Sequence, residues 1–202
     1  MHQNKSSSTF FFLAILTIVD LSFLEAKNKC IKGIPENIHG AKPQILIKEM
    51  KARSGGFITS IARQSTEWEI SFTVNFHSFG KNESDWHNIF IITNHGSRQS
   101  YGIRSPLVTT QNSMLQISSA VNSNYDHKYL KYGLVINKPY MIKISQYYIA
   151  NGQYKYRIEL DGEEVHNTLN NDARQFYDMK FYLLRTNGAD CDVSDFKFVN
   201  FL

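Results

Sequence analysis

The residues best suited to chemistry form a cluster of carboxylates, Glu159-Leu160-Asp161-Gly162-Glu163-Glu164. Enzymes that cleave glycosidic bonds with retention use two carboxyl groups about 5 to 5.5 Å apart, one as nucleophile and one as acid. Here Asp161-Gly162 is typical of a two-residue turn, so we expect Glu159 and Glu164 to face each other across a hairpin. A solvated turn is the simpler interpretation, and glycoside hydrolysis is the alternative that this cluster keeps open.

The histidines show no spacing typical of a metal site. Those beyond residue 26 are His39, His77, His87, His95, His127 and His166, and none belongs to a His-x-His or His-Glu-x-x-His motif. We expect His77 and His166 on the polar faces of their strands. The chain also has no Gly-x-Ser-x-Gly motif and no glycine-rich phosphate loop. We therefore expect no catalytic residue, no metal site and no cofactor; calcium stays possible, with no ligands to assign.

A polar and aromatic segment is the best candidate for binding. Its candidate ligand-binding residues are Asn122, Asn124, Tyr125, Asp126, His127 and Tyr129. Amides and carboxylates can form hydrogen bonds to sugar hydroxyls, and aromatic rings can stack on the apolar faces of sugars. Asn and Asp also favour turns, so an ordinary loop over residues 122–131 is the alternative.

Two cations could add a basic surface for sulfated glycans. Lys155 and Arg157 are two residues apart in an expected strand, so their side chains share its outward face. Such charges more often form a solvated surface, and that interpretation stays open. The basic residues are spread along the chain and do not form the dense stripe typical of nucleic-acid binding.

The first 26 of the 202 residues are typical of a signal peptide. Lys5 precedes an apolar run from Phe10 to Val19, and Ala26 is a small residue suited to cleavage. The run is shorter than the roughly 20 residues of a membrane span, so we expect secretion to the extracellular space and no stable membrane span. Residues 27–202 would then form a single domain with a net charge of +5, beginning with a short strand and loop in residues 27–55.

The cysteines and one sequon agree with an extracellular location. Cys30 and Cys191 are the two cysteines of the chain, and in an oxidising compartment we expect them to form a disulfide. Two free or intermolecular thiols are the alternative. The sequon Asn82-Glu83-Ser84 lies in a polar stretch and predicts N-glycosylation of Asn82 in an exposed loop.

Hydrophobic alternation predicts strands along most of the chain. From Trp68 to His77, large apolar residues occupy every second position, as in a strand with one face toward a core. Shorter apolar runs predict further strands at 45–47, 88–93, 101–108, 114–121, 178–185 and 193–201. Helical periodicity is weak throughout. Many short strands separated by turns indicate an all-β fold, an antiparallel two-sheet sandwich or jelly roll.

Two glycine turns fix the expected register in the middle of the chain. A three-residue loop, Ala150-Asn151-Gly152, would pair Ile144 with Ile158 and place both in the core. It would likewise pair Ile142 with Leu160. The Asp161-Gly162 turn would then pair Ile158 with Val165 on the same face.

In the order and spacing of these segments, residues 68–201 resemble the laminin-G-like and concanavalin-A-like jelly rolls. More narrowly, they are similar to small secreted invertebrate domains, many of them cnidarian. The residues that carry the resemblance are Trp68-x-Ile70-x-Phe72-x-Val74, Trp86-x-Asn88-Ile89-Phe90, Ile117-x-Ser119-Ala120-Val121-Asn122, Tyr156-x-Ile158-x-Leu160-Asp161-Gly162-Glu163-x-Val165 and Val193-Ser194-Asp195-Phe196-Lys197-Phe198.

The resemblance implies a role in binding a glycan or an extracellular-matrix or cell-surface protein. A glycosidase branch of these folds carries Glu-x-Asp-x-x-Glu on one strand, and the cluster that starts at Glu159 fits those letters. In this chain a turn interrupts them, which favours binding without catalysis. A secreted glycoside hydrolase or lyase is the alternative function, and a structural extracellular component without a small ligand is the second alternative.

Overall fold

Alternating side chains build the strands of this chain, and Trp68–Phe76 (β3) is the clearest case. Along β3 every second residue is fully buried and those between are partly exposed, as its sequence predicts. The computed structural model describes residues 43–47, 55–79, 84–185 and 187–201, all within one compact unit that spans residues 35–202. The expected signal peptide lies outside the described residues.

The described residues form strands that are joined by short turns and loops. The other strands are β1 (Pro43–Ile47), β2 (Gly56–Gln64), β4 (His87–Thr93), β5 (Leu107–Gln111), β6 (Met114–Val121), β7 (Asn124–Lys131), β8 (Pro139–Ala150), β9 (Gln153–Leu160), β10 (Glu163–Asn170), β11 (Phe176–Leu183) and β12 (Cys191–Phe201). Within this part of the chain, no helix has the length and apolar character needed to cross a bilayer.

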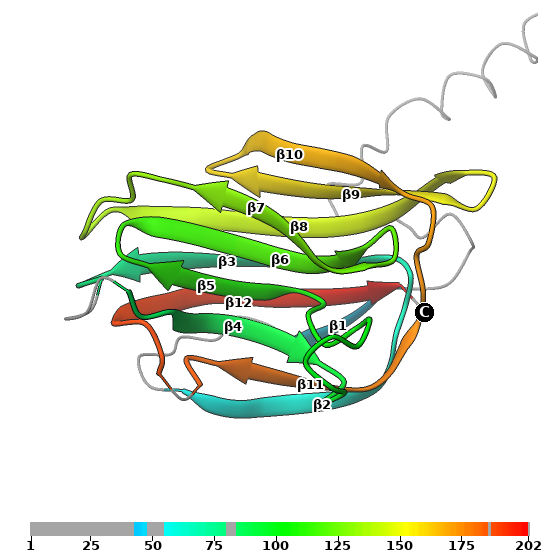
Figure 1. Cartoon of the computed structure of the whole chain (residues 1–202), viewed down its shortest axis with the longest axis horizontal. Coiled ribbons are helices and arrows are strands. Elements are labelled where there is room, and N and C mark those ends of the chain that lie inside the picture. Colours follow the sequence, from blue (N-terminus) through cyan, green and yellow to red (C-terminus); the bar gives the residue numbers. More distant parts are fainter. Residues whose placement is uncertain (1–42, 48–54, 80–83, 186, 202) are drawn as a thin grey trace, which may run out of the picture. The chain divides into compact units, whose positions relative to one another are not determined.

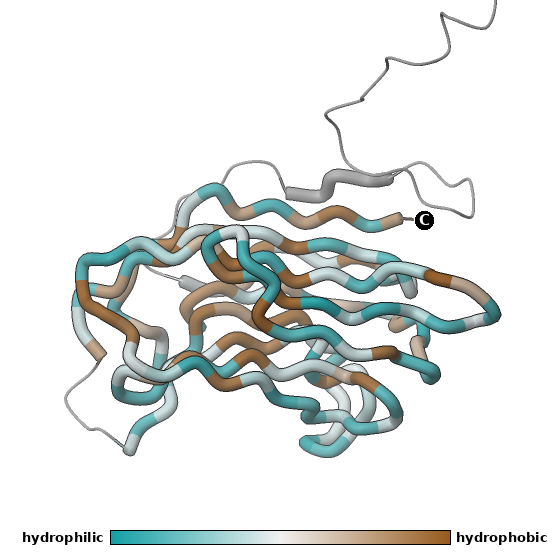
Figure 2. The backbone as a smooth tube through the Cα atoms, turned by 90° about the horizontal axis from the view of Figure 1, so that it is seen from above, coloured by the Kyte–Doolittle hydropathy of each residue, from teal (hydrophilic) through white to brown (hydrophobic). Residues whose placement is uncertain are grey.

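Two six-stranded antiparallel sheets are stacked face to face, which confirms the predicted sandwich (Figure 1). Sheet 1 has the order β1-β12-β3-β8-β9-β10, and sheet 2 has the order β2-β11-β4-β5-β6-β7. Strands β10 and β7 therefore each form one edge of their sheet, and both lie on the upper side of Figure 1. Hydrophobic and hydrophilic segments alternate along the strands (Figure 2), because successive side chains point to opposite faces.

An aromatic core joins the two sheets. Phe90 of β4 lies 4.8 Å from Phe196 of β12 between ring centroids, and Phe181 of β11 lies 4.9 Å from Phe198 of β12. All four side chains are fully buried. Aromatic rings remove large apolar areas from water, so these contacts account for much of the force that holds the sheets together.

The predicted pairing of β8 with β9 is confirmed. Ile144 pairs with Ile158 and Ile142 pairs with Leu160, and all four side chains are buried. The predicted three-residue loop is wrong: Ala150 pairs with Gln153, so the turn is Asn151-Gly152, with φ values of 51° and 74°. An irregularity between Tyr148 and Ala150 compensates for the shorter turn, and the register beyond it is the predicted one.

A second irregularity changes the face of one histidine. Glu164 pairs with Glu159 as predicted, but the register shifts between Glu164 and His166. His166 therefore lies opposite Ile158, where Val165 was expected. A one-residue shift exchanges the two faces of a strand, so the prediction of His166 on the polar face is wrong.

Two further expectations about strands differ from the structure. The segment expected to be a strand at 101–108 is irregular up to Pro106, and only its end belongs to β5. The segment expected to be a loop at 122–131 contains strand β7. Pairing with β6 outweighs the weak strand preference of Asn and Asp there, because β7 completes the edge of sheet 2.

Candidate functional site

The carboxylate cluster lies on the outer face of sheet 1 and is held in ion pairs. Arg157 bridges the two glutamates, with Nη2 at 2.7 Å from Glu159 Oε1 and Nε at 2.8 Å from Glu164 Oε2. Lys143 Nζ lies 4.0 Å from Glu159 Oε1. The two carboxylates face each other as predicted, but a cation separates and neutralises them. The geometry gives them a role in joining β8, β9 and β10.

The same contacts decide the character of the predicted basic surface. Lys155 Nζ lies 3.8 Å from Glu164 Oε2, and Arg157 is shared between Glu159 and Glu164. The face is therefore a row of mixed charge, in which both cations already have partners. A role of Lys155 and Arg157 in binding sulfated glycans stays a prediction.

The predicted binding segment is divided between the two faces of β7. His127 and Tyr129 turn toward the sandwich interior, where both rings pack near His166. Asp126 and Lys128 lie on the outer face and form an ion pair of 3.0 Å. A strand cannot present adjacent residues to one ligand, so these candidates do not form a single site.

The two asparagines of the segment are engaged within the protein. Asn122 Oδ1 accepts a 2.7 Å hydrogen bond from the backbone N–H of Asn171, and its Nδ2 donates to the Leu169 carbonyl at 2.5 Å. Asn124 Oδ1 accepts a 2.9 Å hydrogen bond from the Asp126 backbone. Asn122 therefore connects the β6–β7 turn to the end of β10, which is a structural role.

Arg104 holds the carboxylate and the ring in the middle of the segment. Its guanidinium pairs with Asp126 and lies 5.9 Å from the centre of the Tyr125 ring. Burial alone would raise the pKa of Asp126, but hydrogen bonds from Arg104 and Lys128 outweigh it and lower that pKa. Asp126 is therefore an ionised partner of two cations at neutral pH.

His127 and His166 meet where the edges of the two sheets approach each other. Their Nε2 atoms are 2.9 Å apart, so one ring donates a hydrogen bond that the other accepts. The fully buried ring of Tyr156 packs against both. Burial lowers the pKa of both histidines, and for His127 the neighbouring His166 lowers it further. The contact joins β7 to β10, and double protonation would break it.

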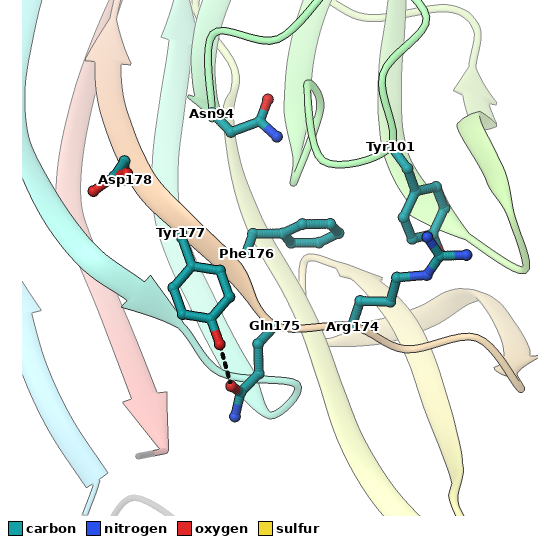
Figure 3. A pocket seen from close by; sticks show the side chains of 7 residues that line it. All are labelled: Asn94, Tyr101, Arg174, Gln175, Phe176, Tyr177 and Asp178. Atoms are coloured by element: carbon teal, nitrogen blue, oxygen red, sulfur yellow. Dashed lines mark hydrogen bonds between the residues drawn. The ribbon is translucent and has the colours of Figure 1, made fainter.

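An open pocket that the sequence did not predict lies at the start of β11 (Figure 3). It encloses about 400 Å³ and is lined by Asn94, Tyr101, Arg174, Gln175, Phe176, Tyr177 and Asp178. Asn94 and Tyr101 come from the β4–β5 connection, whereas Arg174 and Gln175 precede β11. Phe176 packs against Tyr101 with 5.7 Å between ring centroids, and Tyr177 is 60% exposed. The pocket therefore combines an anchored aromatic pair with an accessible ring.

Asp172 organises one wall of this pocket. Arg174 donates to both of its carboxylate oxygens, from Nε at 2.7 Å and from Nη2 at 2.6 Å. Ser123 Oγ donates to the same carboxylate at 2.6 Å, and the Tyr101 hydroxyl donates to the Asp172 carbonyl at 2.9 Å. These bonds, first from Arg174 and then from Ser123, lower the pKa of Asp172. Through Ser123, the segment predicted to bind a ligand supports the pocket without lining it.

The positions of the pocket side chains suit recognition of a sugar. The Arg174 guanidinium lies 4.6 Å from the centre of the Tyr101 ring, and the Tyr177 hydroxyl donates to Gln175 Oε1 at 3.2 Å (Figure 3). Burial, followed by the Asp172 carboxylate, raises the pKa of Tyr101, so its hydroxyl remains a donor at neutral pH. Amides, a carboxylate and the accessible Tyr177 ring together provide hydrogen bonds and stacking.

Two predicted features concern residues that the structure does not describe. Asn82, the expected glycosylation site, and Cys30, one half of the expected disulfide, lie outside the described residues. Cys191 is a free, buried thiol, and burial, followed by the Asp190 and Asp192 carboxylates, raises its pKa to about 12. The structure thus shows no disulfide at Cys191, and the bond to Cys30 stays a prediction.

The fold of this chain has counterparts among solved structures. No family model and no curated protein matches the chain. The structure is similar to the receptor binding domain of botulinum neurotoxin D, with a TM-score of 0.51 and 12% identity over 86% of this chain and 47% of that chain. The fold is a concanavalin-A-like jelly roll.

Two further structures are similar to the chain at TM-scores below 0.5. The botulinum neurotoxin type G receptor binding domain has a TM-score of 0.48 and 11% identity over 80% of this chain and 43% of that chain. The endo-β-1,4-glucuronan lyase of the fungus Trichoderma reesei has a TM-score of 0.45 and 12% identity over 83% of this chain and 93% of that chain. The chain spans less than half of the neurotoxin domains that it matches. At these identities the likeness concerns the fold alone.

Proposed function

We propose that this jelly roll is a secreted, non-catalytic module that binds a glycan through the pocket at the start of β11. The proposal goes further than the fold and includes secretion after removal of residues 1–26, glycosylation of Asn82 and the Cys30–Cys191 disulfide. It also includes the narrower resemblance to small secreted laminin-G-like domains. The botulinum neurotoxin structures are receptor binding domains by name, which agrees with a role in recognition.

The observation that carries the proposal is which side chains line the pocket and how firmly they are held in place. Tyr177 presents an accessible ring, while Tyr101 is fixed by a hydrogen bond to the Asp172 carbonyl and by the Arg174 guanidinium above it. Asn94 and Gln175 add amide groups beside these rings. Rigid rings next to planar polar groups lose little conformational entropy on binding, which suits a ligand that is itself polar and flexible.

The carboxylates considered for hydrolysis do not contribute to this pocket. Glu159 and Glu164 lie on sheet 1 in ion pairs with Arg157, whereas the pocket is built from the start of β11 and the connections that flank sheet 2. Binding at the pocket therefore needs no contribution from the Glu159 cluster, which supports a binding module over a hydrolase.

A glycan array probed with the full chain, with calcium and with a chelator, tests the proposal. The wild type should bind at least one glycan. Tyr177→Ala should weaken that binding roughly 2- to 10-fold, because one stacked ring contributes modestly to affinity. Tyr132→Ala is the matched control, since Tyr132 is 65% exposed but lies in the β7–β8 connection. Absence of glycan binding, or equal losses in both variants, would refute the assignment of this pocket.

A further inference from the structure

A second cluster of aromatic and cationic side chains lies at the other end of β11. Tyr182 packs edge-to-face against Phe57 at 5.7 Å between ring centroids, and its hydroxyl lies 2.7 Å from His95 Nε2. The Arg185 guanidinium lies 4.7 Å from the centre of the same ring. Phe57 is 58% exposed, so the cluster presents an accessible ring beside a cation.

This cluster shares one face of sheet 2 with the middle of β11. Met179, Phe181 and Leu183 point into the core, so the residues between them, Lys180 and Tyr182, point outward. Asn94 lines the pocket, and the next residue, His95, contacts Tyr182. Asp178 and Tyr182 are four residues apart, which corresponds to about 13 Å of strand. The β4–β5 connection therefore links the pocket to the second cluster along β11.

Cations without a carboxylate partner among the described residues lie along this surface. Lys180 and Arg185 are exposed, and within the described part of the chain neither forms an ion pair with a carboxylate. Burial is the largest cause that lowers the pKa of His95, and the positive charges of Lys180 and Arg185 lower it further. The field of these cations therefore reaches the ring that contacts Tyr182. At the pocket end, Arg174 is already paired with Asp172, and the lining also contains the Asp178 carboxylate. Lys180 and Arg185 therefore supply positive charge without a carboxylate partner at the Tyr182 end, and Arg63, which pairs with Tyr177 across the sheet, is one more exposed cation beside the pocket.

We propose that the pocket is one end of an elongated site along β11 that binds an acidic oligosaccharide. The hydroxyl groups of a neutral sugar form hydrogen bonds with Asn94, Gln175 and Asp178 in the pocket. A carboxylate or sulfate further along the ligand meets Lys180 and Arg185, and a sugar ring stacks near Phe57 and Tyr182. The inference rests on the proposed function, because it specifies the ligand class for the same pocket.

Matched ligands that differ only in their anionic groups test the charge requirement. The first pair is polygalacturonate oligosaccharides before and after reduction of the carboxyl groups, and the second is heparin oligosaccharides before and after desulfation. Isothermal titration with the full chain should show tighter binding of at least one acidic member than of its neutral counterpart. That preference should weaken as salt is raised, because exposed charges are screened. Equal binding within both pairs would overturn the inference.

Variants that lack the positive charges test whether Lys180 and Arg185 bind the anionic group of the ligand. The double variant Lys180→Gln/Arg185→Gln should lose roughly 3- to 30-fold in affinity for the acidic ligand and little for the neutral one. Lys131→Gln is the matched control, since Lys131 is an exposed lysine at the end of β7. A preference for acid that survives in the double variant, or an equal loss in the control, would overturn the proposed position.

Ligand length separates this inference from the function on which it rests. Affinity should rise from a monosaccharide to a tetrasaccharide, because one ring cannot reach both ends of the surface. If glycans bind and Tyr177→Ala weakens them, but length and charge have no effect, the elongated acidic site is wrong and the pocket function stands. If no glycan binds at all, both proposals fail.

Discussion

Asn170 at the end of β10 is the residue whose loss should affect stability and the pocket together. Its side chain is 1% exposed. Its Oδ1 accepts hydrogen bonds from the backbone N–H groups of Asn122 at 3.0 Å and Asp172 at 3.1 Å. Its Nδ2 donates to Gln146 Oε1 of β8 at 2.8 Å. One amide thus ties together β8, the β6–β7 turn and the segment that leads to Asp172.

Asn170→Ala should destabilise the protein by about 2 to 4 kcal/mol. Each of the three hydrogen bonds contributes about 0.5 to 1.5 kcal/mol net, and the variant leaves the buried Gln146 oxygen without this donor. For a domain of this size the loss corresponds to a decrease in Tm of roughly 4 to 16 °C. Urea unfolding followed by Trp fluorescence would measure the change in free energy. Because Asp172 holds Arg174 and Tyr101, glycan binding by the folded variant should also weaken.

Asn167→Ala on the same strand is the matched control. Asn167 is exposed, and its Nδ2 donates to Glu164, so its removal should change the free energy of unfolding by no more than about 0.5 kcal/mol. Equal effects of the two substitutions, or a loss below about 0.5 kcal/mol for Asn170→Ala, would refute this reasoning. Loss of stability with unchanged glycan binding would show that Asn170 does not position the pocket.

The remaining predictions concern the sheet edges, the core and the outer face of sheet 1. Burial lowers the pKa of both His127 and His166, and for His127 the neighbouring His166 lowers it further. As the pH falls below about 6.5, the two histidines are therefore protonated in the unfolded chain before they are protonated in the folded protein. The stability contributed by the neutral pair is therefore present above that pH and lost on acidification, and the double variant His127→Gln/His166→Gln should show a flatter Tm profile between pH 7.5 and 5; an unchanged profile would contradict this. Phe90→Ala should cost about 3 to 5 kcal/mol in urea unfolding, because Phe90 is fully buried against Phe196 and Phe181, and a loss below 1 kcal/mol would mean that the sheets do not pack as described. Glu159→Gln should leave glycan binding unchanged and cost at most about 1 kcal/mol of stability, since its carboxylate serves an ion pair with Arg157; hydrolysis of a glycan by the wild type that disappears in this variant would restore the hydrolase hypothesis.

Local patterns were sufficient to predict the architecture. Apolar residues at every second position identify β3 because a strand that covers a core has no other way to bury them. The buried isoleucines of β8 and β9 fix their mutual register, since any odd shift would expose them. That constraint was strong enough to give the right pairing even though the turn at Asn151-Gly152 is one residue shorter than expected.

The errors occurred where a neighbouring strand overrides the local pattern. An irregularity in the pairing of β9 with β10 after Glu164 turns His166 inward. No residue type in that stretch predicts the irregularity, because Val165 suits the inner face at least as well as His166. Residues 124–131 read as a loop on their own, but they form a strand because the edge of β6 supplies hydrogen-bond partners. The predicted ligand segment was thereby separated into structural contacts on two faces.

The pocket was missed for a related reason. The run from Arg174 to Asp178 contains a cation, an amide, two rings and a carboxylate, and this composition is visible in the sequence. Nothing in that run indicates Asn94 and Tyr101, which come from a connection more than 70 residues earlier. Only the pairing of β11 with β4 brings these segments to one place.

The sequence by itself determined that the chain is a two-sheet sandwich and which residues of its central strands face the core, because steric alternation and the burial of apolar surface act over a few neighbouring residues. The tertiary structure alone decided which polar groups meet: Asp172 with Arg174 and Ser123, His127 with His166, and Asn94 with the start of β11. Those contacts depend on strand order, on irregularities in register and on how the sheets stack, and these are settled by the packing of the whole domain.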